Sequence, residues 1–469
     1  MKKWFLVFLA AAFVWLSAMP GVSAAADVRF NGTYYVTGYY DDNHTLKKDG
    51  STSSAFFAQK LQIGATFKVQ EGLDVTTRFN IHDRVWNGSR SSASPRARTG
   101  DTTSSENIDF DWSYVSFLTS VGKFDVGYQQ GGNVWGCTFG NSEWARPRIK
   151  FTTKIGPWIF IALTEKEQEG DYGAGAVQAD DDKDHYVLAT VYVWDKGNAG
   201  LLWKGLFYEN NTASFGGVPY LGFRQKYHVL SPYFKMNAGP LYLEGQVYYI
   251  FGQFLQYENE SLAKLVNPTT SDIDISGWSA YLMAKYSAGP VYFGGLFGYV
   301  SGDDATTTDK YEGGVGGGED WKPCLILFND DLYQWTGMLG SGAIYGSLDS
   351  ATITWKGNEF GNGFLYQVFA GVSPMEKLTI NAAFTYAVAD SQKIPINYAY
   401  IVNRNAYYTY GSSDYGTEFD ITATYKIYDN LSYMVGFGYL WTGDWFKGSN
   451  PNAEVGNNYL FVNRLTATF

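Results

Sequence analysis

Candidate catalytic groups are scarce in this sequence of 469 residues, which contains only four histidines. A serine or cysteine nucleophile needs a base within hydrogen-bond reach and a third group that orients this base. His44 and His185 lie in polar stretches typical of exposed loops, whereas His82 and His228 fall on the polar face of alternating stretches. The GxSxG motif of a nucleophile elbow is absent. We therefore predict that the protein is not an enzyme.

One run of acidic residues could bind a cation. The hexapeptide DDDKDH at 180–185 brings carboxylates together, but it lacks the fixed spacing of a calcium-binding loop. Runs of charge usually solvate a surface, so we favour an exposed acidic loop over a metal site. The two cysteines exclude a cysteine-rich scaffold and a CxxCH haem attachment. The sequence therefore predicts no metal site and no cofactor.

Many other charged residues alternate with apolar ones. In 223–236, for example, Arg224 and Lys226 fall on the opposite face from Tyr227 and Val229, because side chains alternate along a strand. This alternation assigns two sets of charged residues to polar faces. The basic set is Arg78, Arg84, Arg146, Arg148, Lys150, Arg224, Lys226 and Arg464. The acidic set is Asp109, Asp111, Asp125, Glu418 and Asp420. Apolar residues assigned to the other face include Val85, Trp112, Tyr227 and Val229.

The elements that carry these residues are β-strands. Glycine and aromatic residues are abundant, and no stretch after residue 26 keeps a helical period with caps. Eighteen alternating, aromatic-rich segments follow one another from 27–40 to 457–469. No Pro-rich or Ser-rich linker divides them. The sequence predicts one all-β domain.

The connections between these strands alternate between two classes. Very short turns, such as EG at 71–72 and GP at 156–157, alternate with long polar loops, such as 90–106 and 301–320. This pattern is typical of a transmembrane β-barrel of the outer-membrane type. Because no backbone group can stay unpaired in lipid, the sheet must close, and the last strand must pair with the first. We predict an antiparallel barrel of eighteen strands, with sixteen as the alternative, and both termini in the periplasm.

The N-terminal stretch predicts export. Lys2 and Lys3 precede an apolar run of about sixteen residues, too short to span a membrane, and small residues follow up to Ala26. We expect a signal peptide at 1–26, cleaved after Ala24 or Ala26, and a barrel at 27–469. Without the two lysines, 33 basic residues face 46 acidic ones, a formal charge of −13 that repels phosphate backbones and excludes nucleic acid as a partner.

The longest connection, 301–358, contains an apolar stretch at 321–346 that needs a surface to pack on. We predict that this stretch folds into the barrel as a constriction, as long functional loops often do. An inward fold could bring Cys324 to Cys137 in another long connection, and the periplasm is oxidising. A disulfide bond requires Cα atoms within about 7 Å. Two free thiols on separate loops are the alternative.

The polar faces must line a water-filled lumen, as in barrels of sixteen to eighteen strands. If the basic and acidic walls stand apart, the shared register of the basic residues predicts a preference for anions. If the two sets neutralise one another, the lumen discriminates little between ions. Both arrangements remain open at the level of the sequence.

Two stretches resemble known outer-membrane proteins. Phe461, Leu465 and Phe469 match the C-terminal assembly signal that the insertion machinery reads in bacterial outer-membrane barrels, with Asn463 as an interruption. The stretch 416–448 resembles the closing hairpin of alginate-export-type and related eighteen-stranded porins, with the acidic pair Glu418 and Asp420. This resemblance covers about thirty residues and implies the architecture, whereas it leaves the substrate open.

Together these features predict a porin of the Gram-negative outer membrane, through which small hydrophilic solutes and ions diffuse passively. The alternatives are a polysaccharide (alginate-like) export channel and a barrel that sheathes a redox partner. Expected partners are outer-membrane lipid, lipopolysaccharide, the permeating solutes and the barrel-insertion machinery. A monomer and a homotrimer both remain open.

Overall fold

The computed structural model of the chain describes residues 27–48, 53–86, 108–130, 135–139, 145–169, 182–210, 222–259, 261, 264, 272–318, 321–337, 339–340, 360–395 and 407–469. The predicted signal peptide, 1–26, lies outside these residues. The hexapeptide at 180–185 is described only from Asp182 onward.

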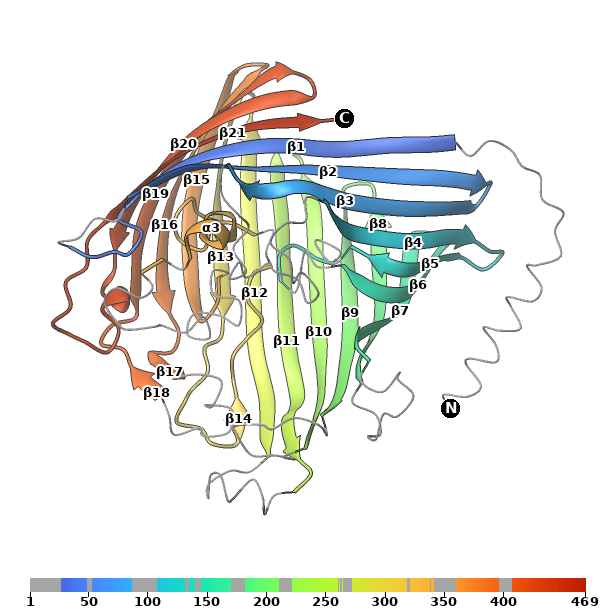
Figure 1. Cartoon of the computed structure of the whole chain (residues 1–469), viewed down its shortest axis with the longest axis horizontal. Helices are drawn as coiled ribbons and strands as arrows, with labels where there is room; N and C mark the ends of the chain where they lie inside the picture. The colour runs from blue at the N-terminus through green and yellow to red at the C-terminus, as the bar shows by residue number, and fades with distance from the viewer. Residues whose placement is uncertain are drawn as a thin grey trace.

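Eighteen antiparallel strands form one closed barrel (Figure 1). Each strand pairs with its neighbour along the chain, and β1 (Asp27–Asp42) closes the ring with β21 (Asn458–Thr468). The prediction of eighteen strands is confirmed. The other barrel strands are β2 (Ser54–Gln70), β3 (Leu73–Val85), β4 (Ile108–Leu118), β5 (Lys123–Gln129), β6 (Arg146–Ile155), β7 (Trp158–Gln168), β8 (Lys183–Trp194), β9 (Gly197–Asn210), β10 (Phe223–Ala238), β11 (Leu241–Tyr257), β12 (Ile273–Ala288), β13 (Val291–Val300), β15 (Gly363–Met375), β16 (Leu378–Ala389), β19 (Asp414–Tyr428) and β20 (Leu431–Thr442).

The seam between the first and last strands is long and regular. It runs from the pair Thr33 and Thr468 to the pair Asp42 and Tyr459. Beyond it, the amide of Gly32 donates to the carbonyl of Phe469 at 2.8 Å, and the amide of Phe469 donates back at 3.1 Å. The last strand therefore has the partner that closure requires.

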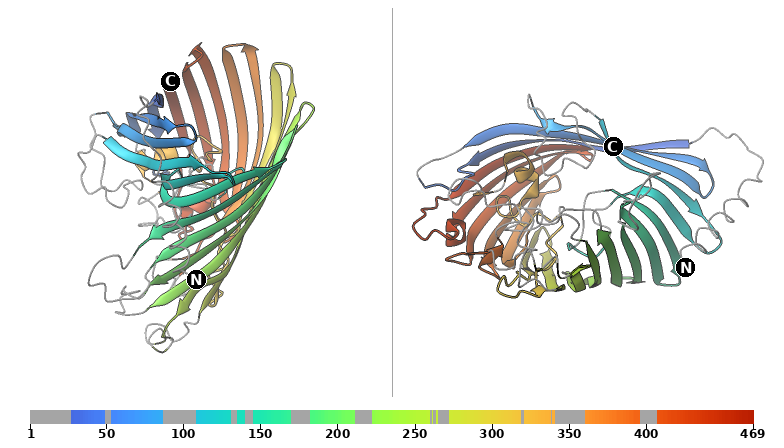
Figure 2. Two further views of the ribbon diagram at one scale, coloured as in Figure 1. Left: turned by 90° about the vertical axis from the view of Figure 1, so that its right-hand side faces the viewer. Right: turned by 60° about the horizontal axis from the view of Figure 1, so that its bottom comes forward.

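The two ends of the barrel differ in their connections (Figure 2). Because the strands alternate in direction, the short turns that join β2 to β3, and each later pair up to β19 and β20, lie at the end that carries Asp27 and Phe469. The long connections lie at the opposite end. The short turns of the sequence thus lie at one rim of the barrel and the long loops at the other.

Smaller elements belong to the long connections. They are β14 (Lys310–Tyr311), which pairs in parallel with β12, the short pair β17 (Lys393–Pro395) and β18 (Tyr407–Thr409), the helix α3 (Asp330–Thr336) and the 3-10 helix η3 (Asp444–Lys447). None of the helices in the described part of the chain is long and apolar enough to cross a membrane.

The two faces of the barrel wall carry different side chains. Large apolar residues project outward, with Phe110 71%, Val368 63% and Leu188 58% exposed. Buried polar residues such as Ser279 and Thr385 point inward. An apolar outside and a polar inside reverse the pattern of a soluble protein and are typical of a barrel in lipid.

Candidate functional site

The segment 321–337 lies inside the barrel and contacts its inner wall (Figure 1). The amides of Ile326 and Leu327 each donate to Glu418 on β19 at 2.7 Å, and the amide of Leu325 donates to Asp420 at 3.3 Å. Glu418 is fully buried. The side chain of Gln367 on β15 also donates to the carbonyl of Pro323 at 2.7 Å. The predicted inward fold is confirmed for this segment, which we call the β19 strut.

The helix α3 forms the C-terminal part of the β19 strut and lies against β21 and the residues that follow β1. The side chain of Asn329 caps the helix by accepting from the amide of Leu332 at 3.4 Å. Asp331 on the helix pairs with Lys322 at 2.8 Å and with Arg464 on β21 at 3.6 Å. The ring of Tyr333 packs on His44, 5.6 Å between centroids. The strut is therefore held at both of its ends.

A second segment, 135–139, also enters the barrel, and we call it the β11 strut. The side-chain oxygen of Gln246 on β11 accepts from the amides of Cys137 and Thr138, both at 2.8 Å, and from Phe139 at 3.2 Å. Trp135 donates its indole N–H to the carbonyl of Ser231 on β10 at 3.0 Å. This strut was not predicted from the sequence, although Trp135 and Phe139 are large aromatic residues within a long polar connection.

The second strut meets the connection that leads into the first. The amide of Gly318 donates to the carbonyl of Thr138 at 3.0 Å, and the rings of Phe139 and Trp321 lie 6.1 Å apart. Trp321 also packs edge-on against Tyr281 of β12, at 5.6 Å. The two struts form one continuous constriction, supported by walls on several sides of the barrel.

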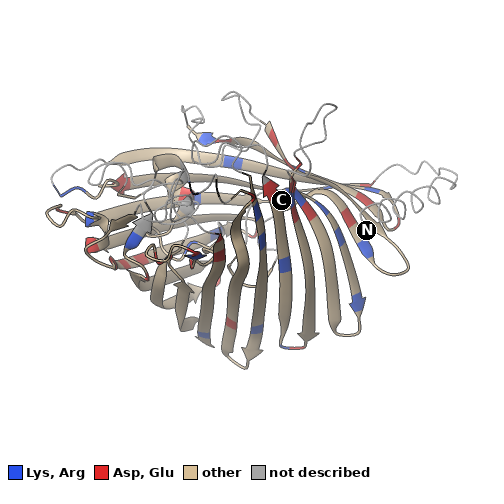
Figure 3. Cartoon of the chain, turned by 90° about the horizontal axis from the view of Figure 1, so that it is seen from below, with Lys and Arg blue, Asp and Glu red and all other residues tan. Residues whose placement is uncertain are grey.

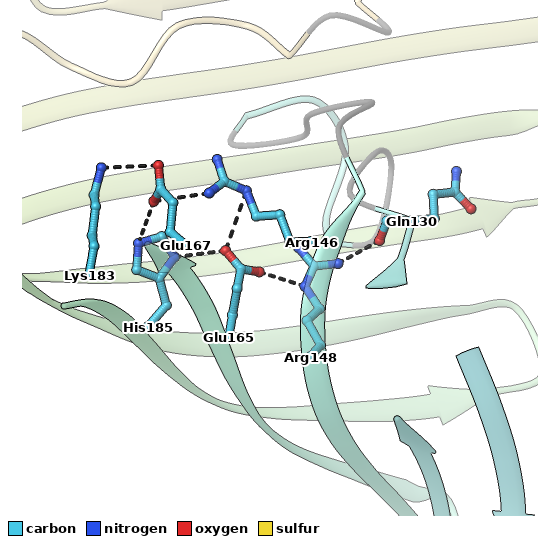
Figure 4. Close-up of polar contacts among 7 residues, drawn as sticks. All are labelled: Gln130, Arg146, Arg148, Glu165, Glu167, Lys183 and His185. Atoms are coloured by element: carbon cyan, nitrogen blue, oxygen red, sulfur yellow. Dashed lines mark hydrogen bonds and ion pairs between the residues drawn. The ribbon is translucent and has the colours of Figure 1, made fainter. Parts of the chain in front are cut away.

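Charged side chains of β6, β7 and β8 form a network on the inner wall (Figure 4). Arg148 donates to Glu165 at 2.5 Å, and Arg146 lies 3.4 Å from Glu165. Arg146 and Lys183 both lie 3.0 Å from Glu167. Arg146 and Arg148 thus take their predicted inward positions, where they pair with two glutamates that were not among the residues predicted to line the lumen.

Other inward charged residues of β3 to β6 also form ion pairs. Arg78 forms an ion pair with Asp111, and Lys150 lies 3.2 Å from Asp125. Asp125 also accepts a hydrogen bond from Ser116 at 2.5 Å. Figure 3 shows basic and acidic positions side by side on neighbouring strands. On strands β3 to β8, the described basic and acidic residues therefore neutralise one another locally and do not form separate walls.

Asp109, Glu418, Asp420 and Arg464 also take the predicted inward positions. Asp109 pairs in register with Asn80, which is buried and bonded to Gln62 of β2. Arg464 pairs with Asp331 of the strut. Phe461 and Phe469 lie on the outer face, 52% and 59% exposed, whereas the role of these two residues and Leu465 as an assembly signal stays a prediction.

The register predicted for β10 is wrong. Tyr227 and Val229 point inward, where they line a cavity of about 100 Å³ together with Lys204 and Val315. Lys226 is exposed on the outer face, as is Arg224 near the rim, where it lies 3.4 Å from Glu209 and 3.3 Å from Glu258. The physical reason is that the connection around Val315 covers this part of the inner wall, so apolar side chains face inward here.

Two β-bulges displace further predicted residues. On β3 the register shifts around His82, whose φ is +50°, so that Asp83 turns inward to Lys60 at 3.4 Å and Arg84 pairs with the outer-face residue Gln59. Arg84 was predicted in the lumen and Val85 outside, and each is on the other face. On β4 a shift opposite Arg78 turns Trp112 inward, against the prediction, with its ring 3.8 Å from the guanidinium.

The histidines also differ from their predicted places. His185 lies on β8, only 3% exposed, with its ring nitrogens 2.9 Å from Glu165 and 2.9 Å from Glu167. His44 is buried and lies 2.9 Å from Asp41. His228 packs against Trp203 on the outer face. The two buried histidines, His44 and His185, therefore each lie beside at least one carboxylate.

The two cysteines are free thiols, which contradicts the disulfide bond. The inward fold occurs, but it brings the cysteines to different walls. Cys137 is held at Gln246 on β11, whereas the next residue after Cys324 binds Asp420 on β19. Burial raises the pKa of the Cys137 thiol to about 12 and that of Cys324 well above its ordinary value.

Because the thiolate is the reactive form, neither cysteine is expected to react with iodoacetamide at pH 8 while the barrel is folded. After unfolding without reductant, both cysteines should be alkylated. Peptide mapping by mass spectrometry distinguishes the outcomes. If neither thiol is alkylated after unfolding, Cys137 and Cys324 are joined by a disulfide bond. Rapid alkylation of the folded barrel would contradict the burial of the two cysteines in the struts.

The geometry defines a class of protein: a closed, membrane-type barrel whose polar lumen is narrowed by two struts. No protein-family model matches the chain, and a search of curated proteins finds no match. Among solved structures, the chain is similar to the outer membrane protein opdK of Pseudomonas aeruginosa, at 10% identity and a TM-score of 0.49, covering 94% of this chain and 99% of that chain. A BenF-like porin of Pseudomonas fluorescens Pf-5 gives 11% identity and a TM-score of 0.49, covering 94% and 99%. The outer membrane channel DcaP of Acinetobacter baumannii gives 13% identity and 0.42, covering 96% and 100%.

Proposed function

We propose that the protein is an outer-membrane porin through which small hydrophilic solutes and ions diffuse passively. The observation that carries the proposal is the closed barrel of eighteen strands with an apolar outer face and a charged, constricted lumen. A barrel of this size leaves an aqueous channel unless side chains or loops fill it. The struts narrow this channel, which favours small solutes over large ones.

The same barrel supports an orientation. Outer-membrane barrels have short turns on the periplasmic side and long loops outside. We therefore infer that Asp27 and Phe469 lie at the periplasmic rim and that the long connections face the exterior. Outer-membrane lipid then contacts the apolar outer wall, and lipopolysaccharide contacts the rim that carries the long loops.

Export of a polysaccharide is less well supported. The resemblance of 416–448 to the alginate-export type depends on the acidic pair of β19. Glu418 and Asp420 accept backbone N–H groups of the β19 strut, so they hold a constriction in the position that a polymer would need to pass. The pair therefore supports a narrow channel.

Reconstitution tests the proposal directly. Purified protein in planar bilayers is expected to give discrete conductance steps, and proteoliposomes should swell in small sugars and amino acids with a rate that falls as solute size increases. A matched preparation without protein is the control. Folded protein that inserts into the bilayer but gives neither steps nor swelling would overturn the proposal and indicate a closed plug.

A further inference from the structure

Three potential metal ligands meet where the β19 strut contacts the inner face of the barrel wall. One ligand atom each from Cys324, Glu418 and Asp420 lie within 4.8 Å of one another. All three residues are buried, with exposures of 4%, 0% and 6%. Cys324 is far in the sequence from Glu418 and Asp420, which lie two positions apart on β19, and only the inward fold of the strut brings the thiol to the two carboxylates.

The two carboxylates lack a compensating charge. Within the described residues, no lysine, arginine or histidine forms an ion pair with Glu418 or Asp420; their partners are the backbone N–H groups of the strut and one another. Burial of an unpaired carboxylate is costly, because the charge loses its hydration, and two adjacent carboxylates repel one another. A cation or a shared proton must therefore offset their charge.

One oxygen of the cluster is also left without a partner. Asp420 uses Oδ2 to accept from Leu325, whereas its Oδ1 is buried and has no N–H or hydroxyl donor; the neighbouring carboxyl of Glu418 can reach Asp420 only through a shared proton. The space beside this oxygen depends on Gly438 of β20, because a Cβ there would lie 2.8 Å from Oδ1 and 3.2 Å from Leu325. A buried carboxylate oxygen without an N–H donor, next to a second carboxylate and a thiol, is suited to bind a cation.

We propose that Cys324, Glu418 and Asp420 bind one divalent metal ion of the zinc class, which ties the β19 strut to the barrel wall. A thiolate with two carboxylates suits zinc better than magnesium or calcium, which prefer oxygen ligands alone. Binding replaces the thiol proton and the proton that Glu418 and Asp420 share in the metal-free protein, and both protons go to solvent. A water molecule completes the fourth position of a tetrahedral site.

The present geometry fits such an ion after a small contraction. Zinc–ligand bonds of about 2.0–2.3 Å place neighbouring tetrahedral ligands about 3.4–3.6 Å apart. The three ligand atoms already lie within 4.8 Å of one another, so small side-chain movements bring them to these distances. The amides of Ile326 and Leu327 would orient the Glu418 carboxylate, as hydrogen bonds around a metal site commonly do. The inference concerns the attachment of the strut and does not depend on the proposed transport function.

Metal content measures the site. The folded full-length barrel in detergent is stripped with EDTA, incubated with Zn²⁺ at pH 8, desalted and analysed by mass spectrometry for elements. Wild-type protein is expected to retain about one zinc per chain. The variant C324A should retain less than about one tenth of the zinc that wild type retains. Cys137→Ala is the matched control, because it removes the buried cysteine of the other strut, and it should bind like wild type.

Cobalt provides a second readout. Co²⁺ bound to a thiolate gives a charge-transfer absorption that should appear in wild type and in C137A and be absent in C324A. Retention of the heat-modifiable gel mobility of a folded barrel shows that each variant has folded. A folded wild-type barrel that holds no more zinc than C324A would overturn the proposal, and Glu418 and Asp420 would then share a proton instead. Equal loss in C137A would assign the binding to protein thiols in general and would overturn it as well.

Discussion

Replacing Glu418 by leucine is expected to raise single-channel conductance roughly twofold, because the freed strut would no longer narrow the cross-section that carries ions. The substitution removes both acceptors of the Ile326 and Leu327 amides. Each buried N–H group left without a partner costs about 1–3 kcal/mol. The strut can recover this cost by leaving the wall, since its amides then bind water in the lumen.

Two further variants provide the upper and lower reference values for the conductance of E418L. Deletion of 321–337 sets the conductance of a lumen without the β19 strut. Glu376→Gln changes an exposed glutamate in the turn between β15 and β16, far from the strut, and should leave conductance unchanged. If E418L conducts like wild type while the deletion conducts more, Glu418 does not hold the strut. If the deletion also has no effect, the strut does not limit the channel.

The second large effect concerns ion selectivity. Arg146 and Arg148 face Glu165 and Glu167 across β6 and β7 at 2.5–3.4 Å, so the wild-type wall is locally neutralised. We expect the wild-type channel to discriminate only weakly between anions and cations. The double variant E165Q/E167Q should shift the reversal potential in a salt gradient clearly toward anions, because unpaired guanidinium groups would then line the lumen.

The converse variant serves as the control for selectivity. R146Q/R148Q should shift the reversal potential toward cations by a similar amount. Removal of one partner of a buried ion pair lowers the free energy of unfolding by about 3–5 kcal/mol. Both double variants must therefore be shown to be folded, by the heat-modifiable gel mobility of a folded barrel. A strong anion preference in wild type that survives R146Q/R148Q would place the selective charges elsewhere in the lumen.

The architecture could be predicted from the sequence because lipid imposes it on every strand. A wall exposed to hydrocarbon needs an apolar residue at every second position and a closed set of hydrogen bonds. These requirements are local, so alternation and turn length were enough to give the strands and the pairing of β1 with β21. The inward position of 321–337 was also predictable, since an apolar stretch cannot stay in water without a surface.

The inner wall could not be predicted in the same way. Where a strut or loop covers the wall, as Val315 covers Tyr227 and Val229, apolar residues occur on both faces of the strand. The alternation of apolar and polar residues then no longer shows which face points to the lumen. The bulges beside His82 and Asp111 shift the register by one residue, and a shift of one residue exchanges the faces. Glu165 and Glu167, the partners of the arginines, were missed because the end of β7 has no apolar residues that alternate with them and so resembles the polar connection that follows.

The seam has a consequence for the order in which the barrel forms. Asp41 and Asn458 meet across 417 positions of sequence, whereas the other wall pairings join strands that follow one another. Bringing such distant ends of a free chain together costs about 5 kcal/mol in loop-closure entropy. Until it closes, the sheet carries two edges of unpaired backbone groups, which hydrocarbon does not tolerate. Entry into the bilayer and closure of the seam must therefore be coupled, and a half-inserted open sheet is not a stable stage of assembly.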